Sequence, residues 1–256
     1  MRDKICELHW NAQPNERGEC STCERQHEES ERRKAALTEK TQAATDNNHA
    51  LSPRFRSKTL DNFRLNTAED VDVVRRQKLA LKKCRDFIDA YPKRTGLVFI
   101  GGTGTGKNHL ACAIVNELQK HRGKSFTAHV TTAYGLIVDL KATWDRTPRE
   151  DGSQRLSHDR MIEHLKKIDI VVIDEIDAQF GSDTDRLLLT HVVNLRYEWQ
   201  HPTIFIGNVA RGDLKKHLGD RIIDRLFESD AGTEDNPDFI VSCVWPSHRR
   251  NGGRAF

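Results

Sequence analysis

A glycine-rich stretch that ends in a lysine carries the residues best suited to chemistry in this sequence. It reads Gly101-Gly102-Thr103-Gly104-Thr105-Gly106-Lys107-Asn108, follows the apolar run 97–100 and opens a helical pattern at His109. Glycines let successive backbone N–H groups point at one anion, and a helix N-terminus favours negative charge. The stretch fits the phosphate-loop pattern G-x-x-x-x-G-K-[ST] except at its last position. We therefore predict a nucleotide-binding loop over residues 101–109, with Lys107 reaching the β- and γ-phosphates.

Two acidic residues follow a second apolar run. Residues 170–173 are continuously aliphatic, as in parallel strands buried on both faces, and Asp174 and Glu175 come directly after them. Acids at the carboxyl ends of such strands face the ligand crevice. We expect Asp174 to hold Mg²⁺ and Glu175 to polarise the attacking water. Asn108 stands where a Ser or Thr hydroxyl normally binds Mg²⁺, so we expect a weaker metal ligand there and slow hydrolysis.

Three more polar residues follow later apolar segments. Asn208 ends the apolar run 203–207, where a side chain can sense a γ-phosphate. Arg221 and Arg225 lie four residues apart after Gly219 and share one face of a predicted helix.

The first 30 residues contain a possible zinc site. Cys6 and His9 are separated by two residues, as are Cys20 and Cys23. Two such pairs can close tetrahedrally around Zn²⁺, and His27 is an alternative to His9 as the fourth ligand. So short a segment cannot fold by apolar burial alone, which favours the metal site over chance cysteines. Cys84, Cys112 and Cys243 fall within apolar patterns, and we expect buried thiols there.

The elements that must position these residues alternate between strand and helix. The chain has 256 residues, enough for one or two domains. The patterns predict helices over 71–91, 109–118, 133–144 and 187–199, a helix pair over 214–226, and strands over 97–100, 125–130, 168–175, 203–208 and 239–244. We therefore expect an α/β fold with a parallel sheet, divided into a zinc module (1–30), a charged helix and linker (31–62) and an ATPase domain (63–256).

The overall composition limits the function classes. No apolar run approaches the length of a membrane span, and the N-terminus lacks a signal-peptide core, so we expect a cytosolic protein without a membrane partner. The net charge of +3 argues against a protein that coats DNA generally, since phosphate contacts require concentrated basic residues. Arginines and phenylalanines alternate over 53–63. They fit contacts with adenine or nucleic acid and a pinned linker equally well.

From about Phe63 to Arg250 the chain resembles the AAA+ ATPase domain of the DnaC-type replicative helicase loaders. The residues that carry the likeness are Gly104 to Ala111, Val172 to Ile176 and Leu218 to Arg225. Asn108 is part of it, since this family also carries Asn there. The IstB-type transposition ATPases share these core motifs and are the nearest alternative.

The resemblance implies a role for each matching residue. Lys107 becomes the phosphate-binding lysine, Asp174 and Glu175 the Walker B pair and Asn208 the sensor 1 residue. Arg225, with Arg221 as second candidate, matches the arginine finger that acts on a neighbouring subunit's ATP, and Arg249 matches the sensor 2 arginine. Residues 134–144 match a helix that lines a single-stranded DNA path. Lys141 could contact a phosphate there, and Trp144 could either stack on a base or pack in the core.

The implied function is an ATP switch. With ATP and Mg²⁺ such a protein assembles with itself and a replicative hexameric helicase, which it delivers onto single-stranded DNA. A zinc-binding N-terminus that grips the helicase resembles the DnaI-type loaders rather than the enteric DnaC pattern. Two other functions stay open: a transposition helper ATPase, and a zinc-ribbon DNA-binding protein whose ATPase is degenerate, which Asn108 keeps possible.

Overall fold

The computed structural model describes residues 51–65, 70–144, 157–178, 182–228 and 237–248. The chain divides into two compact units, Met1–Asn48 and His49–Phe256, and the described residues all belong to the second. The expected zinc ligands and Arg249 lie outside the described residues; those ligands are Cys6, His9, Cys20, Cys23 and the alternative His27. No helix within the described ranges is long and apolar enough to cross a bilayer.

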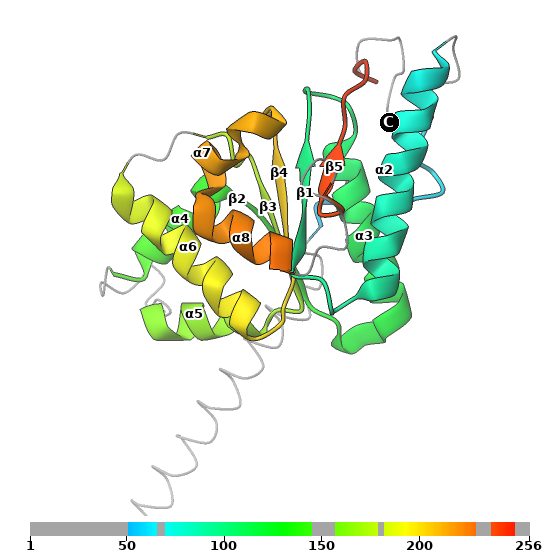
Figure 1. Ribbon diagram of the computed structural model, residues 1–256. Helices are drawn as coiled ribbons and strands as arrows, with labels where there is room; N and C mark the ends of the chain where they lie inside the picture. The colour runs from blue at the N-terminus through cyan, green and yellow to red at the C-terminus, as the bar shows by residue number, and fades with distance from the viewer. Residues whose placement is uncertain (1–50, 66–69, 145–156, 179–181, 229–236, 249–256) are drawn as a thin grey trace, which may run out of the picture. The chain divides into compact units, whose positions relative to one another are not determined.

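A five-stranded parallel sheet forms the centre of the second unit (Figure 1). Its strand order is β2-β3-β4-β1-β5. The strands are β1 (Gly96–Ile100), β2 (Ala128–Thr132), β3 (Ile170–Asp174), β4 (Thr203–Gly207) and β5 (Ile240–Ser242). Ile100 pairs with Gly207, and Ile173 pairs with Phe205, so the predicted ligand-binding residues after β1, β3 and β4 meet at one edge.

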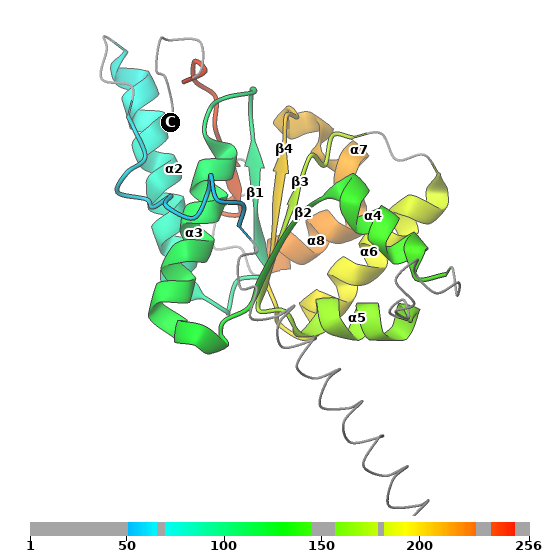
Figure 2. The ribbon, with the colours of Figure 1, turned by 180° about the vertical axis from the view of Figure 1, so that it is seen from behind.

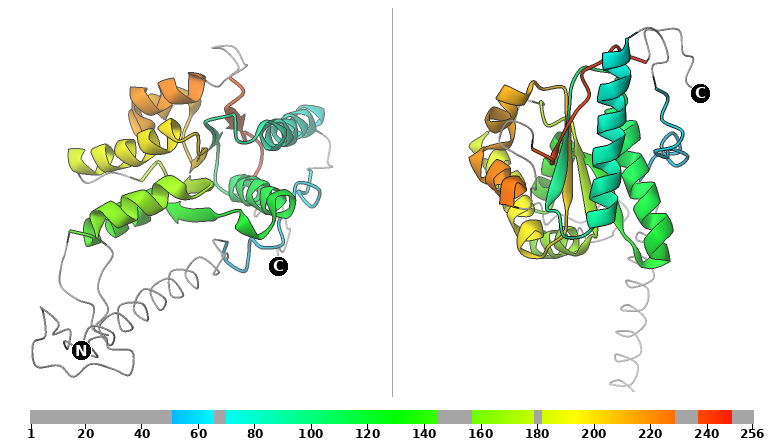
Figure 3. Two further views of the ribbon diagram at one scale, coloured as in Figure 1. Left: turned by 90° about the horizontal axis from the view of Figure 1, so that it is seen from below. Right: turned by 45° about the vertical axis from the view of Figure 1, so that its right-hand side comes forward.

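Alternating strand residues build two cores, one on each face of the sheet. Leu97 and Phe99 of β1 enter a core with α2 (Val71–Ala90) and α3 (Lys107–Arg122). Val98 and Ile100 enter the other core. That core includes α4 (Ala133–Ala142), α5 (His158–Lys167), α6 (Asp183–Glu198), α7 (Leu214–Leu218) and α8 (Asp220–Glu228). The two helical layers are visible from behind in Figure 2 and along the sheet in Figure 3. Burial on both faces explains the continuous aliphatic runs.

Part of the expected linker belongs to the core. Leu51 and Leu60 are buried with Phe63 against the α3 side of the sheet. The Asn116 amide on α3 donates to the carbonyls of Phe55 (3.0 Å) and Lys58 (2.7 Å). The chain from Leu51 onward is therefore packed on the ATPase core, whereas the sequence placed the start of that domain at residue 63.

The elements differ from expectation at two further points. Residues 123–125 form the 3₁₀ helix η1 (Gly123–Ser125), so β2 starts at Ala128 rather than at residue 125. Helix α5 was not expected, because it is short and highly charged; the Ser157 side chain caps it by accepting from the Arg160 N–H. A second 3₁₀ helix, η2 (Arg211–Asp213), precedes α7.

The expectation of buried thiols is confirmed. Cys84, Cys112 and Cys243 are free and buried. Burial raises the pKa of the Cys112 and Cys243 thiols to about 12, so both stay protonated at neutral pH.

Candidate nucleotide-binding site

The glycine-rich loop joins β1 to α3 with a backbone that requires glycine at two positions. Gly101 has a φ of 131°, and a Cβ there would lie 2.3 Å from the Cys243 carbonyl oxygen. Gly106 has a φ of 95°, and a Cβ there would lie 2.7 Å from the Phe63 ring. Both conformations are strained for side-chain-bearing residues. The sequence spacing thus reflects a loop whose shape allows no side chain at these points.

Lys107, the first residue of α3, folds back over the loop. Its Nζ donates to the carbonyl oxygens of Gly101 (2.8 Å) and Gly102 (2.7 Å) and to Asn208 Oδ1 (2.8 Å). The side chain is only 5% exposed. The structure therefore brings the predicted phosphate-binding lysine and the predicted sensor asparagine into direct contact.

Asp174 ends β3 beside the start of α3. Its Oδ1 accepts from the Glu175 backbone N–H (2.7 Å), and its Oδ2 accepts from the Asn108 amide. The two expected Mg²⁺ ligands therefore touch each other. Glu175 is exposed and has a φ of 56°, a strained conformation that in proteins concentrates at functional sites.

Asn208 follows β4 and is held by a residue that the sequence analysis did not select. Its backbone N–H donates to Asp177 Oδ1 (2.9 Å), and its Nδ2 lies 3.4 Å from Asp177 Oδ2. Thr103 Oγ1 lies 3.5 Å from Asn208 Oδ1 on the loop side. An acid three residues beyond Asp174 was the available signal, but its partner 31 positions away was not visible in the sequence.

An aromatic cluster and the C-terminal strand segment support the outer side of the loop. The Phe63 ring makes edge contacts with the rings of His109, Trp245 and His248, at centroid distances of 5.3, 6.4 and 5.7 Å. Trp245 Nε1 donates to the Thr105 carbonyl (2.9 Å), and the His248 N–H donates to the Gly104 carbonyl (3.0 Å). His109 Nε2 lies 2.9 Å from the Thr59 carbonyl, so its side chain contacts the segment 51–65 that packs beside α3.

The two predicted finger arginines lie on α8. Arg225 lies beside the start of β1, whereas the loop follows the end of that strand. Thr95, directly before β1, donates from Oγ1 to the Arg225 carbonyl (3.0 Å). The Arg225 guanidinium stacks on Tyr197 (4.5 Å to the ring centroid) and pairs with Glu228 (3.2 Å). Arg221 is exposed, one helical turn earlier. The structure does not bring Arg225 to its own subunit's loop.

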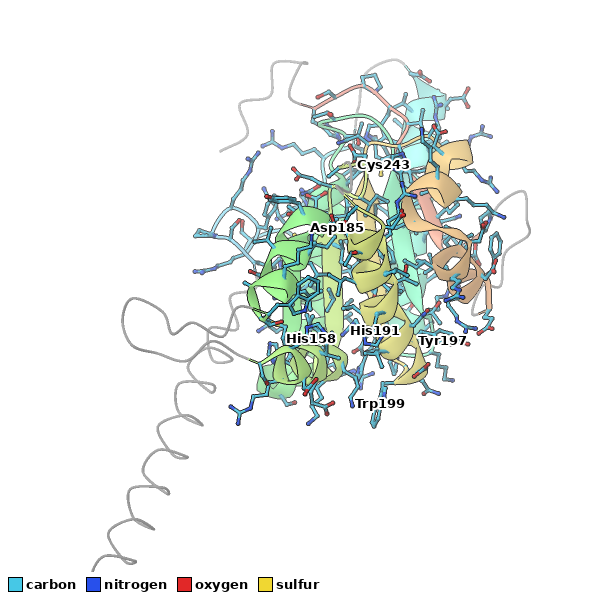
Figure 4. All side chains as sticks on the ribbon, turned by 90° about the vertical axis from the view of Figure 1, so that its left-hand side faces the viewer. His158, Asp185, His191, Tyr197, Trp199 and Cys243 are labelled. Atoms are coloured by element: carbon cyan, nitrogen blue, oxygen red, sulfur yellow. The ribbon has the colours of Figure 1, made fainter. Side chains whose placement is uncertain are left out.

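The helix with the expected DNA contacts is α4 and its end. Tyr134 and Trp144 are 68% and 52% exposed, so Trp144 is not a core residue. Lys141 Nζ lies 2.5 Å from Asp185 Oδ1 on α6, a residue labelled in Figure 4. Lys141, which was expected to contact a DNA phosphate, is therefore paired with a carboxylate.

The residues present suit a magnesium–nucleotide ligand. Gly102 has open space around its Cα, and the backbone turns through Gly101, Gly104 and Gly106 at positive φ, which leaves a cradle without side chains. An ammonium group and a carboxylate–amide pair border it, a donor set that fits phosphate and Mg²⁺. In the described part of the chain, no three His, Cys, Asp or Glu side chains gather as a metal cage. Mg²⁺ usually binds with few protein ligands plus phosphates and water.

Fold and site together define a P-loop ATPase of the AAA+ class. The family model described as IstB-like ATP binding protein matches residues 19–228. The replicative helicase loader DnaC of Escherichia coli (strain K12) is 30% identical over 206 residues, which cover 78% of this chain and 77% of the relative. The chain belongs to this IstB/DnaC family of ATP-binding proteins and is an ATPase.

Solved structures agree with the fold. The DnaC helicase loader superposes with a TM-score of 0.56 at 22% identity, covering 76% of this chain and all of the other. DnaI superposes with a TM-score of 0.53 at 19% identity, covering 77% of this chain and 93% of the other.

Proposed function

We propose that this protein is an ATP-switched loader that delivers a replicative hexameric helicase onto single-stranded DNA. The observation that carries the proposal is the likeness to the E. coli loader over 206 residues. The family match over residues 19–228 includes both the phosphate loop and α8. The geometry of the nucleotide site supports it, because Lys107, Asp174 and Asn208 meet at one edge of the sheet.

Within the nucleotide site each side chain has one proposed task. Lys107 neutralises the β- and γ-phosphates, and Asn108 and Asp174 hold Mg²⁺, which when bound neutralises charge on the transferred phosphate. Glu175, exposed and next to Asp174, orients the attacking water. Asn208 contacts the terminal phosphate, and Arg249 of the same subunit acts as the sensor 2 residue.

The switch lies between subunits. Arg225 lies toward the opposite end of β1 from its own loop, which supports a role at a neighbour's site. A guanidinium from the next subunit would neutralise γ-phosphate charge across the seam, so that ATP holds protomers together and hydrolysis releases them. Arg221 is the second candidate for this role.

Mixing two inactive variants tests the arrangement in trans. Arg225→Ala should leave the ATP affinity of an isolated subunit nearly intact but reduce stimulated hydrolysis by about a thousandfold. A mixture of Arg225→Ala and Lys107→Ala protein should regain partial hydrolysis, because some interfaces pair an intact lysine with an intact arginine. If the mixture stays inactive while either variant mixed with wild type retains activity, Arg225 is not the finger.

The DNA-binding surface that we propose is the exposed side of α4. Tyr134 and Trp144 present aromatic surface there, and stacking on bases does not depend on sequence. Lys141 would have to exchange Asp185 for a DNA phosphate.

The N-terminal region is proposed to carry the helicase-gripping module, with one Zn²⁺ bound by Cys6, Cys20, Cys23 and either His9 or His27. We propose its limits as residues 1–30, with the charged helix and linker following from residue 31 and ending before Leu51, which packs on the ATPase core. Elemental analysis should find about one zinc per chain. A metal-free protein in which these three cysteines react freely under native conditions would rule the module out.

Co-purification with the replicative helicase, with and without ATP, tests the main proposal. We expect ATP-dependent capture of the helicase, which Lys107→Ala abolishes. Capture of a transposase in place of the helicase would favour the transposition-helper function that the family name also covers. Full activity of Lys107→Ala in either assay would instead favour a DNA-binding protein with a degenerate ATPase.

A further inference from the structure

Asp177 links two parts of the nucleotide site: it lies three residues after Asp174, and its carboxylate accepts hydrogen bonds from Asn208. Both of its carboxylate oxygens face this one residue, Oδ1 toward the backbone N–H at 2.9 Å and Oδ2 toward Nδ2 at 3.4 Å. The segment after β3 is thereby tied to the end of β4.

Close backbone packing fixes Asp177 in that place. Ile176 donates its N–H to the Ile206 carbonyl (3.1 Å). A Cβ on Gly207 would lie 2.5 Å from Ile176 Cγ1 and 3.4 Å from Asp177 Oδ1. Glycine at position 207 therefore allows the segment to lie directly against the strand that carries Asn208.

The chemistry of the neighbours dictates how the Asn208 amide is turned. Lys107 Nζ can only donate, so it requires the amide oxygen on its side, and the contact is 2.8 Å. An ionised Asp177 can only accept, so it requires the NH₂ group on the other side. Asp177 uses one N–H of that group, and the second remains for another acceptor.

We propose that Asp177 is the positioning residue that makes Asn208 discriminate ATP from ADP. When Lys107 binds phosphates, its contact with Asn208 Oδ1 is no longer guaranteed, and Asp177 keeps the amide turned. The remaining N–H of Nδ2 then serves the terminal phosphate, which ADP lacks. This inference rests on the proposed nucleotide switch and adds a residue to it.

The negative charge of Asp177 does not itself favour phosphate binding, since a carboxylate near phosphates repels them. Its value must lie in accepting two hydrogen bonds from one residue. Asp177→Asn keeps one acceptor oxygen but adds an NH₂ group, so it should preserve only part of the function.

The test compares affinities for a slowly hydrolysed ATP analogue and for ADP, together with kcat and KM. Asp177→Ala should weaken analogue binding about tenfold and lower kcat about tenfold, as expected for lost hydrogen bonds to a charged group, while ADP affinity stays within about twofold. Asp177→Asn should fall between Ala and wild type. Asp213→Ala is the matched control, because Asp213 is an exposed acid just beyond β4 whose side chain does not cap α7.

A double-mutant cycle separates positioning from a structural role. Asp177→Ala added to Asn208→Ala should cause no further loss of ATP preference, since the first residue acts through the second. Equal losses of ATP and ADP affinity, additive effects in the cycle, or unchanged ATP preference in Asp177→Ala would each overturn the assignment. If the wild-type protein prefers ATP over ADP but does not capture the helicase, that result would count against the loader function and leave the role of Asp177 standing.

Discussion

Lys107 and Arg196 are both buried cations, but the residues that accept their hydrogen bonds differ in exposure to solvent. Lys107 is 5% exposed and donates to three neutral oxygens; Arg196 is 0% exposed and donates to four. The oxygens that Arg196 binds belong to Leu165, Ile168, Pro202 and Thr203, all buried residues, and they join the ends of α5 and α6 to β4. Gly102, a partner of Lys107, is exposed.

The difference teaches how to separate a structural cation from one that can bind a ligand. The acceptors around Arg196 belong to buried residues, so water cannot reach them to replace the guanidinium. Arg196 is therefore fixed in place. Those around Lys107 can be rehydrated when the ammonium moves to a phosphate. Burial lowers the pKa of Arg196 to about 9, which still leaves it charged at neutral pH.

The largest effect is expected from removing the fixed cation. Arg196→Met should destabilise folding by about 4 kcal/mol, because several buried acceptors lose their donors together. Urea denaturation measures this loss. Arg186→Met, on the exposed side of the same helix α6, is the matched control and should change stability by less than about 0.5 kcal/mol. A loss of stability well below this value in Arg196→Met would contradict the contrast, since the acceptors would then be hydrated in the folded variant.

Removing the movable cation should affect binding instead of folding. Lys107→Ala should lower ATP affinity by about a hundredfold or more, since charge-assisted contacts to phosphate are lost, yet change stability by less than about 1 kcal/mol. Calorimetric titration and urea denaturation of one preparation give both numbers. Lys120→Ala, an exposed lysine in the last turn of α3, should alter neither. Unfolding of Lys107→Ala would place this lysine with Arg196 as a structural residue.

The smallest effect concerns a half-buried histidine, His129, whose imidazole can lose its proton. Burial lowers the pKa of His129 on β2; nearby His164 adds to this and Asp139 opposes it. In the unfolded chain a histidine takes up its proton near pH 6.5, above the folded pKa, so the unfolded state binds more protons as pH falls. Stability should therefore be complete above about pH 6.5 and decline toward pH 5.

Urea denaturation at pH 7 and pH 5 measures that decline, and His129→Gln should make it shallower without abolishing it. Four other histidines have pKa values lowered mainly by burial and act in the same direction: His109, His164, His201 and His248. An unchanged slope in His129→Gln would mean that His129 binds its proton equally well in the folded and the unfolded protein, which would contradict a lowered pKa.

The sequence predicted the parts of the fold whose signals are local. The runs around β1, β3 and β4 are aliphatic because both sheet faces are covered, and glycine spacing marks a loop with positive φ. Most of the described helices begin or end within a few residues of expectation. Helix α5 was missed because only Met161, Ile162 and Leu165 face the core among charged neighbours, although Ser157 was a usable cap signal.

Features that depend on distant partners could not be predicted. An arginine within a helix normally faces water, and only the fold shows that Arg196 donates to three carbonyls of two separate segments, the end of α5 and the residue before β4. Lys141 looked available for DNA until α6 placed Asp185 beside it. Asp177 was one more acid after a strand, and its grip on Asn208 exists only because β3 and β4 are neighbours.

The contacts between residues 243–248, which follow β5, and the phosphate loop also set the order in which the nucleotide site forms during synthesis. Thr105 receives its hydrogen bond from Trp245, 140 positions later, and the Ile100 carbonyl receives one from the Cys243 N–H. At about 5–20 residues per second, a ribosome needs about 7 to 28 seconds to make the intervening chain. During that interval a nascent chain has a glycine loop without its outer support. ATP therefore meets a finished binding site only after β5 has emerged and joined the edge of the sheet.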